Sequence, residues 1–326
     1  MTHDAPDLLA LGRISVDLYA QEPGASFLEP QTFVKSVGGS PTNVAVAAAR
    51  LGLTSAVVTA VGDDPLGAYT LSRLADLGVQ TRYVTVQAGG RTPVVLVALE
   101  DPAEPTITFL RAPDAPDTLI GPDAVDERTV ATCHVLWMSG STLALAPTAT
   151  TAMQWLEHRA RRAHTVLDLD LRPSLWGDPA EATTAAARAI DLSSVVIGNR
   201  SECAMAVGTP EPHAAADALL ARGVSTVVVK MGAEGVLLAT AEERVVVEPI
   251  PVTVRCGSGS GDAFGGALAA GLTQGWSLAR TGRLANAAGA LVATRLTCAD
   301  AMPTLPEIEA FASDAEARTE RLVGHG

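Results

Sequence analysis

Positive charge, cysteine and long apolar runs are all scarce in this sequence. Lysine and arginine together number 23 against 36 aspartates and glutamates, and the net charge of -13 argues against nucleic acid or an anionic membrane as a partner. The four cysteines are scattered without a CxxC pair and the six histidines show no ligand spacing, so neither a disulfide framework nor a zinc site is indicated. No apolar run approaches the ~18 residues of a membrane helix, and the first residues lack the features of a signal peptide. We therefore expect a soluble protein of the cytoplasm.

The sequence does contain a regular alternation of apolar runs and alanine-rich segments. Its 326 residues, 48% of them hydrophobic, are enough for one large α/β domain. Buried strands are predicted at 7–12 and 55–62, and helices at 41–52 and 67–78. Further strands are predicted in HVLWMSG, TVLDLDL, SVVIGN and VSTVVVKMG. Strands separated by helices favour a doubly wound, mostly parallel sheet, in which ligands bind at the carboxyl ends of the strands.

Two segments interrupt this alternation. Residues 13–39 and 91–113 each contain two β-rich runs around a polar turn with proline, and neither has room for a crossover helix. We predict one domain over residues 1–326 with a small β-sheet lid, formed by about 13–37 and 91–112. Because open sheet edges favour pairing, we also expect a homodimer through the lid.

The stretch CGSGSGDAFGGALAAG, residues 256–271, combines spaced glycines with the start of a small-residue helix. Gly257, Gly259 and Gly261 let a ligand approach the backbone, and the unpaired first amides of the helix form a site for phosphate. Asp262 is either an N-cap or a base that accepts a proton from an attacking hydroxyl group. The spacing matches neither the P-loop nor the GxGxxG dinucleotide motif.

Three motifs carry a family resemblance. GSGSGDAFGGAL resembles the GAGD signature of the ribokinase-like (PfkB) carbohydrate kinases, VGGSPTNVAVAAARLG (37–52) resembles their first signature, and VGDDPLG (61–67) resembles their VGxDxxG. Their order and spacing fit from Leu8 to about Ala310. The resemblance implies a ribokinase-like doubly wound sheet with a lid, and ATP- and magnesium-dependent phosphorylation of a sugar.

Three further stretches resemble one branch of that family, which phosphorylates 5-dehydro-2-deoxy-D-gluconate in myo-inositol catabolism. They are GRISVDLY (12–19), VGGSPTN (37–43) and CADAMPTLPEIE (298–309), and DLDLRPSLW (168–176) fits the same branch. One departure is that many relatives have Asp-Thr where this chain has Cys256-Gly257. This departure weakens the inference of a nearby monovalent-cation site, so the sequence does not decide whether potassium binds.

Each candidate site residue also has a structural alternative. Asp17 suits sugar hydroxyls or is a solvated charge on an edge strand, and Arg111 suits the carboxylate of a sugar acid or is a surface residue. Asp168, Asp170 and Arg172 alternate along a predicted strand, and an internal salt bridge is their alternative role. The residues assigned to the sugar are Asp17, Gly38, Gly39, Asn43, Arg111, Asp170 and Arg172.

The remaining candidates concern catalysis and the nucleotide. Asp262 is the expected base, and the amides of Gly259, Ser260 and Gly261 stabilise developing negative charge. Asn199 and Glu202 resemble the family's NxxE stretch, with Glu202 holding Mg²⁺ through water, although a capping box explains the same pair. The residues assigned to ATP are Asn199, Lys230, Gly232, Gly235, Gly257 and Asn286.

The predicted reaction is transfer of the γ-phosphoryl group of ATP to the primary hydroxyl of a small sugar acid. The preferred substrate is 5-dehydro-2-deoxy-D-gluconate. The alternatives are a kinase of the same fold for 2-keto-3-deoxygluconate, fructose or ribose, or a non-catalytic sugar or nucleotide sensor.

Overall fold

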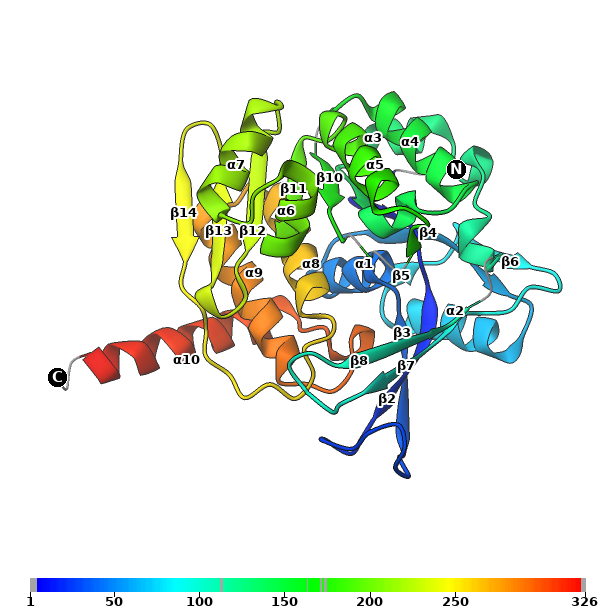
Figure 1. The fold of residues 1–326 in the computed structure, drawn as a ribbon, viewed down its shortest axis with the longest axis horizontal. Coiled ribbons are helices and arrows are strands. Elements are labelled where there is room, and N and C mark those ends of the chain that lie inside the picture. Colours follow the sequence, from blue (N-terminus) through cyan, green and yellow to red (C-terminus); the bar gives the residue numbers. More distant parts are fainter. Residues whose placement is uncertain (1–4, 112–113, 163, 171, 173–174, 324–326) are drawn as a thin grey trace.

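A computed structural model describes residues 5–111, 114–162, 164–170, 172 and 175–323 (Figure 1). Within these ranges ten strands form a mixed sheet in the order β14-β13-β12-β11-β10-β9-β1-β4-β5, and β6 pairs with β4. From β12 to β5 the neighbouring strands are parallel, whereas β13 and β14 join at one edge as antiparallel strands. The bounds are β1 (Leu8–Leu11), β4 (Ser55–Gly62), β5 (Val79–Gln80), β6 (Val84–Gln87), β9 (Val135–Ser139), β10 (His164–Asp168), β11 (Val195–Asn199), β12 (Thr226–Lys230), β13 (Val236–Ala239) and β14 (Arg244–Val247).

Helices cover both faces of this sheet, which explains why its central strands are continuous apolar runs rather than alternating ones (Figure 1). One face packs against α1 (Ser40–Arg50), α2 (Pro65–Asp76), α8 (Ser260–Gln274), α9 (Leu278–Ala293) and α10 (Leu305–Val323). The other packs against α3 (Glu127–Thr132), α4 (Thr148–Arg159), α5 (Pro179–Asp191), α6 (Arg200–Val207) and α7 (Pro212–Ala221). None of the described helices combines the length and apolar character needed to cross a membrane.

The helix starts follow local sequence signals. Pro41 lies in the first turn of α1, where the missing amide hydrogen costs no helical hydrogen bond. The second helix begins at Pro65, two residues before the predicted start, because the Asp64 carboxylate caps it and accepts a hydrogen bond from the Gly67 amide.

A separate four-stranded sheet lies against the main body, in the order β3-β2-β7-β8 (Figure 1). Its strands are β2 (Ser15–Ala20), β3 (Phe33–Gly38), β7 (Val94–Ala98) and β8 (Thr106–Leu110). The two predicted hairpins therefore form and pair through β2 and β7, which run parallel. We call this unit the lid sheet. The predicted end of the second hairpin, residues 112–113, lies outside the described residues.

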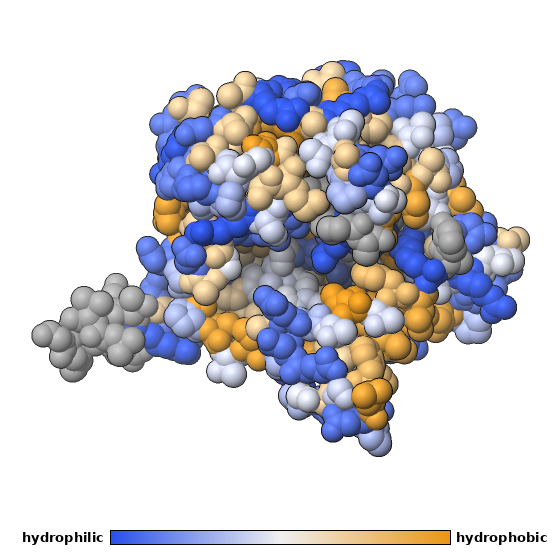
Figure 2. Space-filling view, in the orientation of Figure 1, coloured by the Kyte–Doolittle hydropathy of each residue, from blue (hydrophilic) through white to orange (hydrophobic). Residues whose placement is uncertain are grey.

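The lid sheet stands over the carboxyl ends of the parallel strands, and the face seen in Figure 2 is hollowed between the two units. Side chains alternate along a strand, so Ser15, Asp17 and Tyr19 of β2 all face this hollow. Register places Val95 beside Asp17 and Phe109 beside Val95, so the same face continues across β7 and β8.

Candidate active site

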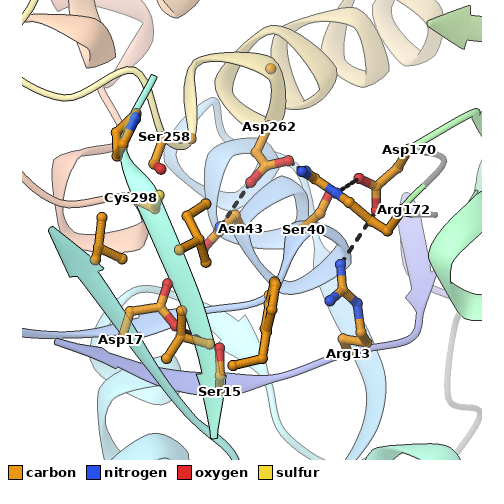
Figure 3. A pocket seen from close by; sticks show the side chains of 18 of the residues that line it. Arg13, Ser15, Asp17, Ser40, Asn43, Asp170, Arg172, Ser258, Asp262 and Cys298 are labelled. Carbon is orange, nitrogen blue, oxygen red and sulfur yellow. Dashed lines mark hydrogen bonds and ion pairs between the residues drawn. The ribbon is translucent and has the colours of Figure 1, made fainter. Parts of the chain in front are cut away.

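A cavity of about 590 Å³ lies between the lid sheet and the main body (Figure 3). The loops after β10, β11 and β12 form its floor, together with the N-terminal turns of α1 and α8. The lid strands β2, β7 and β8 form its roof. Nearly all of the charged residues singled out from the sequence meet here, although they are spread over most of the chain.

Asp262 lies in the first turn of α8, but it is not the N-cap. Gly259 is the N-cap, with φ of 83°, a conformation that favours glycine. The Asp262 carboxylate instead accepts one hydrogen bond at each oxygen, from Ser40 Oγ at 2.7 Å and from Asn43 Nδ2 at 2.8 Å (Figure 3). Burial raises the pKa of Asp262, and the two hydrogen bonds oppose that shift. The carboxylate is therefore oriented and made more basic.

The glycine loop brings the amide end of α8 to the same cavity. Gly257, Gly259 and Gly261 line it, as does Ser258. Ser260 does not line the cavity through its side chain, whose hydroxyl donates to the Gly257 carbonyl oxygen at 3.0 Å. The first amides of a helix lack partners within the helix and carry partial positive charge, so this end of α8 suits an anion.

A second charged group stands beside that amide end. A Cβ atom at Gly261 would lie 3.4 Å from Lys230 Nζ, and Nζ is 3.7 Å from Asp168 Oδ1. Burial lowers the pKa of Lys230, but the carboxylates of Asp168 and Glu202 outweigh this and raise it overall, so the ammonium group stays charged. Burial raises the pKa of Asp168 to about 7 despite Lys230.

Asn199 and Glu202 line the cavity and also form a complete capping box at the start of α6. The Glu202 amide donates to Asn199 Oδ1 at 2.9 Å, and Glu202 Oε2 accepts from the Asn199 amide at 2.7 Å. The structural alternative is thus observed for this pair. It leaves Glu202 with a second carboxylate oxygen that the capping box does not use.

The lid contributes a buried carboxylate. Asp17 is 7% exposed, so it is not a solvated charge on an edge strand. Ser15 Oγ donates to Asp17 Oδ1 at 2.6 Å, and the Tyr19 hydroxyl lies 3.2 Å from Asp17 Oδ2 and 2.7 Å from Cys298 Sγ. Burial raises the pKa of Asp17 to about 6. Gly38 makes room for this carboxylate, because a Cβ atom there would lie 2.0 Å from Asp17 Oδ2.

Three guanidinium groups and two carboxylates gather in the same cavity, where Arg172 and Asp170 lie beside Asp262 of α8 (Figure 3). Arg111 Nη2 lies 2.6 Å from Asp117 Oδ1, and Arg172 Nε lies 2.8 Å from Asp170 Oδ1. Arg13 Nη2 is 3.5 Å from the other oxygen of Asp170 (Figure 3). Burial would raise the pKa of Asp170, but Arg172 and Arg13 hold it below its usual value. This cluster is polar, largely buried and fixed by ion pairs.

The expectation that Asp168, Asp170 and Arg172 share one face of a strand is wrong in its geometry. The strand β10 ends at Asp168, and Asp170 has φ of 26°, which is incompatible with extended backbone. Asp168 therefore turns to Lys230, whereas Asp170 and Arg172 pair with each other. All three side chains still line the cavity.

Three of the expected nucleotide residues lie away from this cavity. Gly232 and Gly235 form the turn between β12 and β13 and are not among its lining residues. Asn286, on α9, lines a second, mainly apolar cavity with Val247 and Ile250, and its Nδ2 donates to the Glu248 carbonyl oxygen at 2.9 Å. One turn further along α9, a Cβ atom at Gly289 would lie 3.0 Å from the Ser260 carbonyl oxygen. Asn286 thus lies one helical turn from the point where α9 packs against the start of α8.

Sequence reasoning missed Ser40 and Arg13. For Ser40 a signal existed, because Ser40 and Asn43 are three residues apart on a predicted helix and so share a face. For Arg13 the sequence held no comparable signal. Its place in the cavity depends on contacts with Asp170 and with the ring of Phe109, 5.6 Å from the guanidinium carbon.

The donor chemistry of the floor fits magnesium better than a monovalent cation. Asp168 and Glu202 supply carboxylate oxygens, and Asp168 Oδ1 is buried without a hydrogen-bond partner in the described structure. No cluster of three or more acidic, histidine or cysteine ligands occurs among the described residues, so phosphate oxygens and water would have to complete such a site. Cys256 is fully buried with Tyr19 and Cys298 in an apolar cluster, where burial raises the pKa of its thiol. A neutral thiol cannot offset the charge of a potassium ion.

Comparison with known proteins identifies the family of the chain. The family model for the pfkB family carbohydrate kinases matches residues 5–305. Over 319 residues the chain is 32% identical to a 5-dehydro-2-deoxygluconokinase from Bacillus anthracis, a match that spans 95% of this chain and 96% of the relative.

Two solved structures extend the comparison. One, from Escherichia coli and provisionally described as a ribokinase II, is in complex with ATP and Mg²⁺; its TM-score is 0.86 at 26% identity, covering 94% of this chain and 99% of that chain. The other is a fructokinase double mutant from Vibrio cholerae with fructose, ADP and potassium bound; its TM-score is 0.81 at 26% identity, covering 94% of this chain and 97% of that chain.

The chain therefore belongs to the pfkB family of carbohydrate kinases. Within that class it is an ATP-dependent sugar kinase, and its relatives include enzymes named 5-dehydro-2-deoxygluconokinase. The predicted ribokinase-like fold, with its mostly parallel sheet and separate small sheet, is confirmed.

Proposed function

We propose that this kinase transfers the γ-phosphoryl group of ATP to the primary hydroxyl of a small sugar acid, with 5-dehydro-2-deoxy-D-gluconate as the substrate and its 6-phosphate as the product. The observation that carries the proposal is the make-up of one cavity. It joins an oriented buried carboxylate at a helix amide end to a cluster of guanidinium groups. The names of the relatives in the comparison support the choice of sugar acid.

Asp262 acts as the general base. It accepts the proton of the substrate hydroxyl while the hydroxyl oxygen forms a bond to the γ-phosphorus and the bond from that phosphorus to the β–γ bridging oxygen breaks, releasing ADP. Ser40 and Asn43 hold the carboxylate in place, and its raised pKa makes it a better proton acceptor. The amides of Gly259, Ser260 and Gly261 stabilise the negative charge that develops on the transferred group.

The triphosphate lies along the floor between Lys230, Asn199 and the Gly257 loop. Glu202 and Asp168 face the position where Mg²⁺ would be held through water, and that ion would neutralise phosphate charge. We assign the adenine to the apolar cavity beside Asn286. The turn with Gly232 and Gly235 shapes this end of the nucleotide site without lining the main cavity.

The sugar lies under the lid sheet. Asp17, Gly39 before α1 and Asn43 in α1 line the cavity beside its hydroxyl groups, and Gly38 acts by leaving room for Asp17. Arg111, Asp170 and Arg172 border the acid end. Closure of the lid sheet would exclude water, which otherwise competes with the sugar for the phosphoryl group.

The outer face of the lid sheet supports a homodimer. By register Phe33 and Leu110 lie on the face opposite Asp17, and they are 39% and 53% exposed. Exposed apolar side chains on an open sheet favour pairing with a second copy. We place the enzyme in the cytoplasm, where thiols stay reduced, because all four cysteines are free and buried.

A panel of acceptors tests this proposal, with ADP release as the readout. We expect 5-dehydro-2-deoxy-D-gluconate to give a higher kcat/KM than 2-keto-3-deoxygluconate, D-fructose or D-ribose. A higher kcat/KM for another acceptor would overturn the substrate assignment but not the reaction. ATP binding without ADP release on any acceptor would instead favour a sensor.

A further inference from the structure

The guanidinium cluster of the cavity has more cations than ion-pair partners. Three guanidinium groups, of Arg13, Arg111 and Arg172, form ion pairs with two carboxylates, of Asp117 and Asp170. One guanidinium group therefore has no carboxylate of its own within ion-pair distance, although Asp17 and Asp262 also act on the cluster from further away. A partly desolvated charge without a full partner is costly, and an anionic ligand would remove that cost.

The pairing identifies which guanidinium group lacks an ion-pair partner of its own. Arg111 is held by Asp117, whose side chain is fully buried, at 2.6 Å. Arg172 is held by Asp170 through a hydrogen bond of 2.8 Å, and it is 48% exposed, so water also solvates it. Arg13 shares Asp170 at 3.5 Å, a long contact to a carboxylate that already has a partner.

Arg13 is also incompletely hydrogen-bonded. Its side chain is 11% exposed, and its Nε is buried without an acceptor in the described structure. A guanidinium group offers five donors in a planar fork, which matches the two oxygens of a carboxylate. Burial lowers the pKa of Arg13, and the neighbouring charges of Arg111 and Arg172 lower it further. Asp170 and Asp117 act in the opposite direction but do not cancel this effect, so the charged form of Arg13 is less stable than that of an exposed arginine.

The surrounding chain fixes Arg13 before any ligand binds. Its carbonyl oxygen accepts a hydrogen bond from Thr42 Oγ1 at 2.9 Å, and the next amide, of Ile14, donates to Asp117 Oδ2 at 3.1 Å. The guanidinium carbon lies 5.6 Å from the centre of the Phe109 ring on the lid. A preorganised cation of this kind loses little side-chain entropy when it binds a ligand.

From these contacts we propose that Arg13, rather than Arg111, binds the carboxylate of the substrate and determines the preference for sugar acids over neutral sugars. This inference rests on the proposed function. One guanidinium fork with donors still free matches the two oxygens of a single carboxylate. Arg111 then has a structural role, because its charge is already used by Asp117.

The test compares wild type with Arg13→Met and Arg13→Lys on 5-dehydro-2-deoxy-D-gluconate and D-fructose. We expect Arg13→Met to lower kcat/KM for the acid by roughly 10²-fold, mainly through KM, because a charge-assisted hydrogen-bonded pair is lost. The value for D-fructose stays the same or rises, and Arg13→Lys restores part of the preference. Arg188→Met, on the exposed face of α5, is the matched control and leaves both values unchanged.

Calorimetric binding of the sugar acid without nucleotide gives a readout that does not depend on turnover. If Arg13→Met does not fold, the closer isostere Arg13→Gln is measured instead, with the same loss of affinity expected. An equal loss for the acid and D-fructose would overturn the proposal, as would an unchanged preference for the acid. A wild-type preference for D-fructose 1-phosphate would show that the anion is a phosphate and would also overturn it. If the wild-type enzyme showed no preference for an acid, the proposed substrate class would be wrong as well. If only the Arg13 variants failed to change the preference, the role of Arg13 alone would be wrong.

Discussion

The two ends of the cavity are built in different ways. At the catalytic end, Ser40, Asn43 and Asp262 come from the first turns of two helices that begin in recognisable motifs, although the two helices are far apart in the sequence. At the sugar end, the charged residues come from four separate segments, and each cation has an acidic partner. The catalytic residues can thus be recognised from their motifs, whereas no motif marks the guanidinium cluster.

The largest effect should come from the catalytic end. Asp262→Asn keeps the size and one acceptor of the side chain but removes the base, so we expect kcat to fall by ~10²-fold or more. Binding of ATP should change little, because the amide end of α8 and Lys230 are untouched. Steady-state kinetics with a separate measurement of ATP affinity would check this.

Ser40→Ala sharpens the same test. It removes one hydrogen bond to Asp262 and leaves the base itself, so the loss of kcat should be several-fold smaller than for Asp262→Asn. Turnover of Asp262→Asn close to that of wild type would contradict the assignment of the base and the contrast between the two ends.

A smaller effect is expected from pH at the lid. Because burial raises the pKa of Asp17 to about 6, the carboxylate that accepts hydrogen bonds from the sugar is lost as pH falls through that value. The dissociation constant of the sugar should rise by up to ~10-fold for the first pH unit below the pKa. Calorimetry without nucleotide measures the dissociation constant of the sugar across this pH range.

The matched variant for this test is Asp17→Asn, whose sugar affinity should be weaker near neutral pH and flat across the same range. Arg13, which faces Asp17, stays charged throughout, and Asp262 is the other acid that acts on Asp17. A wild-type affinity that did not change between neutral pH and pH 5 would remove Asp17 from sugar binding.

A still smaller effect concerns how the lid is anchored. Asp64 caps α2 and accepts hydrogen bonds from the Thr92 amide and hydroxyl, both at 2.8 Å, next to the start of β7. We expect Asp64→Ala to lower the free energy of unfolding by about 1 kcal/mol, the usual loss for an N-cap. Asp63→Ala, the exposed neighbour, is the control. Equal melting temperatures for the two variants would contradict this role.

Much of the fold could be predicted because its signals are local. The strand at Ser55–Gly62 was predicted to the residue, and the α1 start followed from proline in its first turn. The predicted alternation beyond Asp168 failed because β10 ends there and Asp170 takes a positive φ, which no pattern in the sequence indicates. The Asp170 carboxylate then meets Arg172, Arg13 and Ser141, although the sequence pattern favoured a longer strand.

The site could be predicted only in part, for the same reason. The carboxylate of Asp262 was identified, but its partner Ser40 was overlooked although the three-residue spacing to Asn43 pointed to it. Arg111 was assigned to the substrate because arginine suits a carboxylate. The sequence could not reveal that Asp117, six residues later, already occupies that guanidinium group.

The last prediction is that potassium changes neither kcat nor the melting temperature appreciably. Cys256 is fully buried in an apolar cluster, and the Ala293 carbonyl oxygen already accepts hydrogen bonds from the Arg255 and Cys256 amides at 2.8 and 3.2 Å. This position therefore supplies no charge to offset a monovalent cation, and we expect kcat in potassium chloride to stay within about two-fold of kcat in tetramethylammonium chloride at equal ionic strength. The melting temperature should be equally insensitive to the exchange. Strong activation by potassium would contradict this prediction and would mean that other oxygen atoms near this position hold the ion.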